Sequence, residues 1–224
     1  MRKSGILMPV ASLPGKYGIG TFGNVYEQYI DAPFITNHDM GRVANALKSE
    51  PEALKYAGGL LLSMDGSPFV YYGEEIGMKS KGTKDENKRL PMLWSYDAES
   101  KSIGNLIGIT KGPKDADTGI FSSFDGVYEQ EKDPDSILNY YKKAISIRNA
   151  YPEIARGKIV IDEENTKDNI AVIKKVWQGK EIVIIYNNSP SDSYDFMIKG
   201  TPYEKYKLAA YLTVDGEEVK KGKT

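Results

Sequence analysis

The sequence predicts an α/β domain at residues 1–150, followed by an antiparallel all-β domain at residues 151–224. In the first domain, short apolar runs flank a segment with helical periodicity, which is the strand-helix-strand pattern of a parallel sheet. In the second, short β-rich runs separated by turn residues follow one another without a helical segment between them. No low-complexity linker separates the two domains, so we place the boundary close to Tyr151.

The first domain opens with two predicted strands. An apolar run at residues 5–10 predicts a strand, and the glycine-rich stretch at residues 12–23 predicts the loop after it. A second apolar run at residues 32–36 predicts another strand. Residues 37–39 follow this run directly, so polar side chains cluster at its C-terminal end.

A helix connects the second strand to a third. The apolar spacing predicts this helix at residues 43–64, broken or kinked near Ser49. Ser49 and Glu52 have the spacing of a capping box, and Pro51 lies in the first turn of the second part. The apolar run at residues 68–72 then predicts a strand parallel to the preceding one.

A long connection and a second helix complete the first domain. Residues 79–132 are rich in Gly, Lys, Asp and Ser with little periodicity, and connections of this length are often functional. A helix is predicted at residues 134–150, with Asp133 as N-cap and Pro134 at the first position; Tyr151, which precedes a proline, ends it. Its expected apolar face consists of Ile137, Leu138, Tyr141 and Ile145.

The second domain contains five predicted strands, at residues 158–161, 170–176, 181–186, 194–198 and 207–214. Asp215 and Gly216 form a hairpin signal near the end of the sequence. We expect these strands to build an antiparallel β-sandwich.

Composition excludes several classes of site and partner. The chain has 30 Lys+Arg and 31 Asp+Glu, so its net charge of −1 provides no long-range field that would attract nucleic acid or an acidic membrane. There is no cysteine, and His38 is the one histidine, so thiolate and histidine-cluster metal sites are excluded. We expect no cofactor, no metal, no nucleic acid and no membrane partner.

The same reasoning gives an expected location. No stretch approaches the roughly 18 apolar residues that a membrane-spanning helix needs. The apolar run near the start is shorter than the apolar core of a signal peptide. We therefore expect a soluble cytoplasmic protein, although a leader that had been removed would leave no trace in this sequence.

Candidate chemistry begins with His38 and Asp39. They follow a predicted strand, and parallel β/α proteins carry their working residues at the C-terminal ends of strands. The residues alone leave an alternative open, in which Asp39 caps the following helix and His38 is a buried imidazole with satisfied hydrogen bonds.

Three motifs resemble the α-amylase family of glycoside hydrolases. They are TNHDMGRV, then GSPFVYYGEEIGM with the later DENKRLPMLWS, and YYKKAISIRNAYPEI, in the order of that family. The resemblance covers about residues 30–215 and implies the C-terminal part of a (β/α)8 barrel followed by the family's C-terminal β domain.

The resemblance also implies roles for individual residues. Asp39 would be the carboxylate that hydrogen-bonds the 2- and 3-hydroxyls of the sugar and stabilises the transition state, with His38 beside it. Arg42 would lie near the substrate, where it pairs with Asp39 or a neighbouring carboxylate, or is solvated. Tyr72 and Trp94 would each be either a sugar platform or a buried anchor.

The two reacting carboxylates of the family are not found. A retaining glycosidase needs a nucleophile and a general acid about 5–5.5 Å apart. The Gly-x-Arg-x-Asp and Asp-x-x-x-Asn-His patterns of the family are absent from the sequence. Glu74 and Glu75 follow the strand next to Asp39 and could form a carboxylate pair, but we favour a structural, loop-anchoring role for Glu75.

Residues 2–23 resemble the opening of 4-α-glucanotransferases, a related barrel family. If they contain the first barrel strand, the chain holds parallel strands one, seven and eight and lacks two to six. In a closed barrel strand eight neighbours strand one, so residues 68–72 would lie between residues 32–36 and 5–10. An internal deletion or a gene fusion would produce such a chain.

Two functions follow from these observations. The first is an α-amylase-like glycoside hydrolase, by ancestry active on α-glucans such as starch and maltooligosaccharides, but catalytically incomplete in this chain. The second is a non-catalytic α-glucan-binding module, or a fragment that a partner chain completes. An open parallel sheet would also expose edges through which copies could self-associate.

Overall fold

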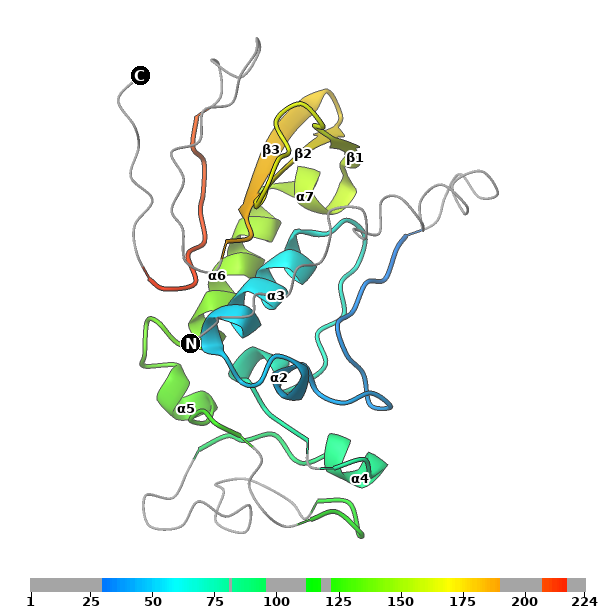
Figure 1. Ribbon diagram of the computed structural model, residues 1–224, viewed down its shortest axis with the longest axis vertical. Helices are drawn as coiled ribbons and strands as arrows, with labels where there is room; N and C mark the ends of the chain where they lie inside the picture. The colour runs from blue at the N-terminus through cyan, green and yellow to red at the C-terminus, as the bar shows by residue number, and fades with distance from the viewer. Residues whose placement is uncertain (1–29, 81, 96–111, 118–121, 190–206, 217–224) are drawn as a thin grey trace.

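The computed structural model describes residues 30–80, 82–95, 112–117, 122–189 and 207–216. Helices occupy the middle of the molecule and a small antiparallel sheet lies at one end (Figure 1). The strands predicted at residues 5–10 and 194–198 lie outside the described residues.

The strands predicted at residues 32–36 and 68–72 are reduced to one isolated bridge, which is parallel, as predicted. Phe34 and Phe69 form a parallel bridge, and the Phe69 N–H donates to the Pro33 carbonyl at 2.8 Å. Ile35 and Val70, one residue further along each segment, pack against the main core. Phe34 and Phe69 therefore point to the opposite face, as strand alternation requires, and are 51% and 62% exposed.

The helix between them is broken where the sequence predicted. It divides into α2, Val43–Ala46, and α3, Pro51–Ser63, with Pro51 at the first position of α3. The predicted capping box is wrong, because Glu50 is the N-cap and makes no side-chain cap. Ser49 instead has a positive φ of 56°, and its hydroxyl donates to the carbonyl of Ala44 in α2.

Helix α6, Ile137–Ala150, packs along α3 (Figure 1). Two glycines of α3 permit the close approach: a Cβ on Gly58 would lie 2.4 Å from the Tyr141 ring, and one on Gly59 would lie 2.5 Å from the Tyr140 hydroxyl. The two helices share the main core, whose buried members are Val43, Ala44, Leu54, Leu62, Ile137, Tyr140, Tyr141 and Ala144.

Two details of α6 differ from the expectation. Its N-cap is Ser136, whose hydroxyl accepts the Asn139 N–H at 3.1 Å, and not Asp133. Ile145 is 41% exposed and does not belong to the buried face, where Ala144 takes its place.

The described part of the connection at residues 79–132, where the sequence shows little periodicity, contains two short helices, α4, Asp85–Lys88, and α5, Val127–Gln130. A third, η3, Glu74–Ile76, lies just before this connection. A second apolar cluster lies beneath them and consists of Ile76, Met78, Leu90, Leu93 and Leu138.

The sheet has strand order β1-β2-β3 and is antiparallel throughout, as predicted. Its strands are β1, Lys158–Ile161; β2, Ile170–Trp177; and β3, Lys180–Asn187. Gln178 and Gly179 have positive φ values of 49° and 75° and form the two-residue turn between β2 and β3.

Other parts of the second domain were not foreseen. A short helix, α7, Pro152–Arg156, precedes β1 and packs on β2 and β3. The strand expected at residues 207–214 is wrong: these residues form no strand, and Leu212 and Val214 pack on the main core. The described part of the domain holds one sheet, and the sandwich remains a prediction.

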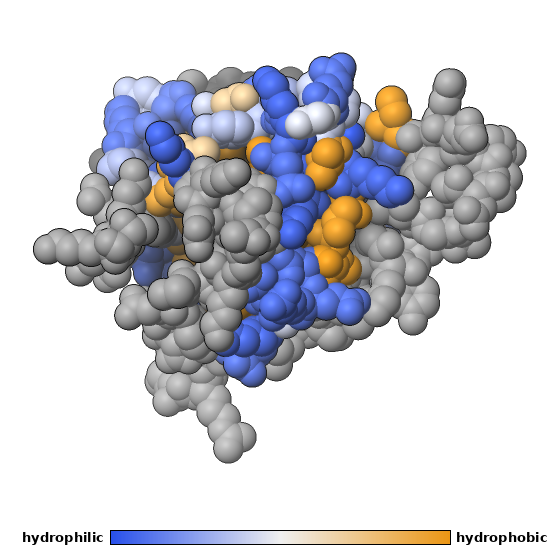
Figure 2. Space-filling view, turned by 90° about the horizontal axis from the view of Figure 1, so that it is seen from above, coloured by the Kyte–Doolittle hydropathy of each residue, from blue (hydrophilic) through white to orange (hydrophobic). Residues whose placement is uncertain are grey.

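The outer face of the sheet is partly apolar. Val160, Val176 and Ile185 are 48%, 38% and 43% exposed. Seen from the end of the molecule that carries the sheet, apolar groups are interspersed among hydrophilic residues (Figure 2).

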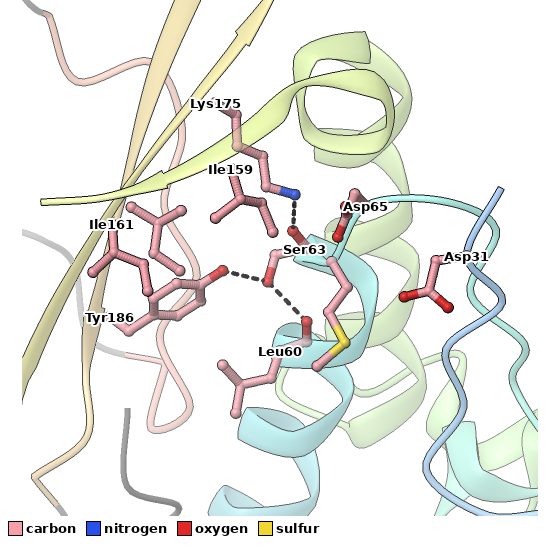
Figure 3. Close-up of a pocket in the computed structure, with 10 residues that line it drawn as sticks. Asp31, Leu60, Ser63, Asp65, Ile159, Ile161, Lys175 and Tyr186 are labelled. Atoms are coloured by element: carbon pink, nitrogen blue, oxygen red, sulfur yellow. Dashed lines mark hydrogen bonds between the residues drawn. The ribbon is translucent and has the colours of Figure 1, made fainter. Parts of the chain in front are cut away.

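A buried lysine joins the sheet to the helices. Lys175 on β2 is 1% exposed and donates to the carbonyls of Ser63, at 2.9 Å, and Ile154, at 2.6 Å. Tyr186 on β3 donates to the Ser63 hydroxyl at 2.8 Å, and Ser63, Lys175 and Tyr186 line a small pocket beside the end of α3 (Figure 3). Burial lowers the pKa of Lys175 to about 8 from an ordinary 10.5, although Asp65 opposes the shift.

We predict that stability depends on pH through Lys175. The pKa of Lys175 is lower in the folded state than in the unfolded state. The contribution of Lys175 to the free energy of unfolding is therefore fully present above pH 10.5 and is lost as pH falls through about 8. The free energy of unfolding of wild type minus that of Lys175→Met should therefore increase by roughly 2 kcal/mol from pH 7 to 9.5. Urea unfolding measures both values.

The matched control is Arg156→Met, which removes an exposed cation from α7. Its difference from wild type should stay constant over the same range. A difference for Lys175→Met that stays flat, or shrinks as pH rises, would contradict the prediction.

Candidate functional site

Asp39 lies on an exposed turn after the bridged segment, with both carboxylate oxygens engaged. The Arg89 guanidinium is 3.0 Å from Oδ1, and Nε2 of His38 is 3.2 Å from Oδ2. The Asp39 and His38 side chains are 63% and 61% exposed. The alternative roles, a helix-capping Asp39 and a buried His38, are both wrong, because the N-cap of α2 is Arg42 and His38 is not buried.

Arg42 is the most deeply buried of the expected site residues. Its side chain is fully buried, with the guanidinium carbon 4.7 Å and 4.8 Å from the ring centroids of Tyr71 and Tyr72. Nη1 donates to the Tyr72 carbonyl at 2.5 Å. Burial lowers the pKa of Arg42, and the neighbouring tyrosines and carboxylates oppose that shift. Arg42 therefore neither pairs with Asp39 nor reaches solvent.

Glu74 ties the two bridged segments together. It is 1% exposed and accepts hydrogen bonds from the Thr36 hydroxyl and, at 3.3 Å, from the Tyr71 N–H. Burial raises its pKa, and the hydrogen bonds and the Arg42 charge act in the opposite direction. Glu74 thus holds the end of the first segment against the turn that follows the second.

Glu75 anchors the same turn. Its Oε2 accepts the Gly73 N–H at 2.7 Å, and burial raises its pKa. Gly73 has a φ of 88°, and a Cβ there would lie 2.6 Å from the Met78 sulfur. The contact to Gly73 fits the loop-anchoring role that we favoured for Glu75.

The two aromatic candidates differ in exposure. Tyr72 is 37% exposed, and its hydroxyl donates to the Leu90 carbonyl at 2.8 Å. Trp94 is 49% exposed, so it is not a buried anchor. In the described part of the chain, His38 contacts Asp39 and Tyr72 contacts Arg42, but no described contact joins Trp94 to these residues.

Sequence reasoning missed the partners of Asp39. Lys88 donates to the Asp39 carbonyl at 2.9 Å, and Arg89 pairs with the Asp39 carboxylate. Lys88 also bonds Asp85 at 2.8 Å, and this contact lowers the pKa of Asp85. The i,i+3 spacing of Asp85 and Lys88 is a local signal. No local pattern predicts the contact between Asp39 and Arg89, which are 50 positions apart.

The described residues contain no group of three or more His, Cys, Asp or Glu side chains that could hold a metal ion. None of their helices is both long enough and apolar enough to cross a bilayer.

The family model described as alpha amylase, catalytic domain, matches residues 16–157. The chain belongs to the α-amylase catalytic-domain family. This family assignment agrees with the three motifs and with the parallel bridge that precedes Asp39.

Relatives within the α-amylase family are much longer than this chain. Alpha-amylase 3 of Dictyoglomus thermophilum is 34% identical over 178 residues, which cover 78% of this chain and 34% of that protein. Alpha-amylase SusG of Bacteroides thetaiotaomicron is 31% identical over 175 residues, covering 74% and 24%. The 4-alpha-glucanotransferase of Thermotoga maritima is 28% identical over 182 residues, covering 80% and 39%.

The solved structures that this chain resembles are also much longer than the chain. Eubacterium rectale Amy13B is similar with a TM-score of 0.66 and 42% identity, over 74% of this chain and 31% of that one. The alpha-amylase from H.orenii has a TM-score of 0.60 and 32% identity, over 78% and 33%. The chain thus spans about a third of the length of these structures.

We predict that Glu74→Leu lowers the free energy of unfolding by about 1–3 kcal/mol. The substitution leaves the buried Thr36 hydroxyl and Tyr71 N–H without their acceptor, and removes a negative charge near Arg42. Urea unfolding followed by circular dichroism measures the change. Glu164→Leu, an exposed position in the β1–β2 loop, is the control and should change stability by less than about 0.5 kcal/mol. Equal effects of the two variants would contradict this account of Glu74.

Proposed function

We propose that this chain is a part of an α-amylase-type glycoside hydrolase that holds an α-glucan through Asp39 but cannot complete the reaction by itself. The observation that carries the proposal is the exposed Asp39 carboxylate, held by Arg89 and His38 at the end of a parallel β segment. In β/α proteins this is where working residues lie.

The chemistry of Asp39 fits substrate binding better than proton transfer. A carboxylate paired with two donors is an acceptor for further hydroxyl groups and stabilises developing positive charge at the sugar. A retaining mechanism needs a nucleophile and a general acid in addition. Glu74 and Glu75 are hydrogen-bonded to backbone groups of their own turn, which argues against them as that pair.

The substrate class comes from the relatives. Their names include alpha-amylases and 4-alpha-glucanotransferases, so we propose an α-glucan such as a maltooligosaccharide. Tyr72 and Trp94 offer partly exposed aromatic faces for its rings, and polar and aromatic groups together are typical of small-molecule sites.

We predict that the purified 224-residue chain does not hydrolyse starch or an aryl maltoside above a buffer blank. It should bind maltoheptaose weakly, and Asp39→Ala should weaken binding about tenfold or more, because it removes a charged acceptor. Isothermal titration calorimetry and reducing-sugar release are the measurements.

The control is Asp115→Ala, at another exposed aspartate, which should bind like wild type. Hydrolysis that survives Asp39→Ala would contradict the role of that residue. Hydrolysis that Glu75→Gln abolishes would show that the carboxylate pair of Glu74 and Glu75 is catalytic.

A second candidate function is that of a fragment completed by another polypeptide. It is favoured by Phe34 and Phe69, two bridged aromatic residues that are 51% and 62% exposed on the face opposite the helices. Large adjacent apolar side chains on an open sheet are typical of an interaction surface. The matched part of this chain covers only 31% and 33% of the solved relatives, so we propose a partner that supplies further parallel strands of the same fold.

We predict a 1:1 complex between this chain and the portion of Eubacterium rectale Amy13B that it does not match. Phe34→Asp with Phe69→Asp should weaken the complex at least about tenfold, because the charges would be buried in the contact. Val160→Asp, at an exposed position of β1, is the control and should leave the complex intact. Analytical ultracentrifugation measures both.

Other results would assign the Phe34 and Phe69 face differently. Concentration-dependent self-association that the double substitution abolishes would show that the face binds a second copy of the chain. A monomeric chain that forms no complex would contradict the second candidate.

A further inference from the structure

The Asp39 carboxylate is held in one orientation in spite of its exposure. Arg89 and His38 each engage one of its oxygens, at 3.0 Å and 3.2 Å. An exposed ion pair contributes little by itself, because two flexible side chains lose freedom when they form it. The orientation of Asp39 therefore depends on what fixes the Arg89 backbone.

Two tyrosine hydroxyls fix the chain on both sides of Arg89. Tyr71 donates to the Lys88 carbonyl at 3.1 Å, and Tyr72 donates to the Leu90 carbonyl at 2.8 Å. Leu90 is 2% exposed and belongs to the second apolar cluster. The backbone of Arg89 is thus held on both sides, at Lys88 and at Leu90.

The two tyrosines are in turn held by Arg42. Their rings are 4.8 Å apart at an interplanar angle of 64°, and the buried guanidinium lies within 4.8 Å of both centroids. A desolvated cation over an aromatic face is attracted more strongly by the ring than an exposed one. Arg42 follows Asp39 by three positions, so the contacts form a closed loop. Arg42 contacts the two tyrosine rings, the tyrosine hydroxyls bind the backbone on either side of Arg89, and Arg89 pairs with Asp39.

We infer that Arg89 is a positioning residue for Asp39, and that the hydroxyls of Tyr71 and Tyr72 set its position. This inference rests on the proposed glucan-binding function.

The test compares five variants of the full chain with wild type, one of which combines Arg89→Leu with both tyrosine changes. Arg89→Leu removes the pairing charge, Arg89→Lys restores a cation, and Tyr71→Phe with Tyr72→Phe removes both hydroxyls but keeps the rings on Arg42. Arg156→Leu, at an exposed arginine on α7, is the control. Maltoheptaose affinity is measured by calorimetry, and the ring signals of His38, the one histidine, are followed by NMR.

Maltoheptaose affinity should fall about tenfold in Arg89→Leu and in the double tyrosine variant, and about threefold in Arg89→Lys. Combining Arg89→Leu with the tyrosine changes should add little, because both act through one contact. The His38 signals should shift in Arg89→Leu and the double tyrosine variant, and stay in place in Arg156→Leu.

Two results would overturn the inference. One is wild-type affinity in Arg89→Leu. The other is a His38 spectrum that neither Arg89→Leu nor the double tyrosine variant alters. If wild type itself does not bind maltoheptaose, the proposed function fails, and the His38 spectrum still decides whether Arg89 and the tyrosines position Asp39.

Discussion

The C-terminal end of α3 is where the two halves of the molecule meet, and cations from both halves bind it. Arg148 on α6 donates to the carbonyls of Leu62, Met64 and Gly66 at 2.8, 2.5 and 2.6 Å. Lys175 on β2 donates to the Ser63 carbonyl from the other side. The last carbonyls of a helix lack partners within it and carry the negative end of its dipole, so the buried Lys175 and the half-buried Arg148 stabilise them. The place of the sheet relative to the helices depends on these contacts.

A second group of buried charges lies beneath the candidate site. Nε and Nη2 of Arg42 are buried and have no hydrogen-bond partner among the described residues, so its charge is stabilised by two tyrosine rings and the field of Glu74 and Glu75. Such a group is expensive to bury and rigid once it is buried. The buried charges thus keep the surface that carries Asp39 and His38 in one arrangement, although these two side chains are exposed to water.

Local signals in the sequence located the long helices and the three-stranded sheet, but they missed the short helices α4, α5 and α7 and did not predict the contacts between elements. Pro51 marked the break between α2 and α3, and the alternation of turn and β residues located β1, β2 and β3 to within one residue. The N-cap of α6 was misplaced because Asp133 and Ser136 are both good caps, and tertiary packing selects between them. Arg89 could not be assigned to Asp39, since their pairing depends on how two tyrosines hold a distant loop. Lys174 and Lys175 are adjacent, and the pattern does not reveal which one is buried.

The single parallel bridge between Phe34 and Phe69 has a consequence for the order of folding. The β2–β3 hairpin closes through a two-residue turn, and hairpins of this kind form in about 1–10 μs. The Phe34–Phe69 bridge has the whole crossover of α2 and α3 between its partners. Loop closure over such a separation loses entropy before any contact compensates for it. We therefore expect the segment that carries Asp39 to reach its native position after the β2–β3 hairpin.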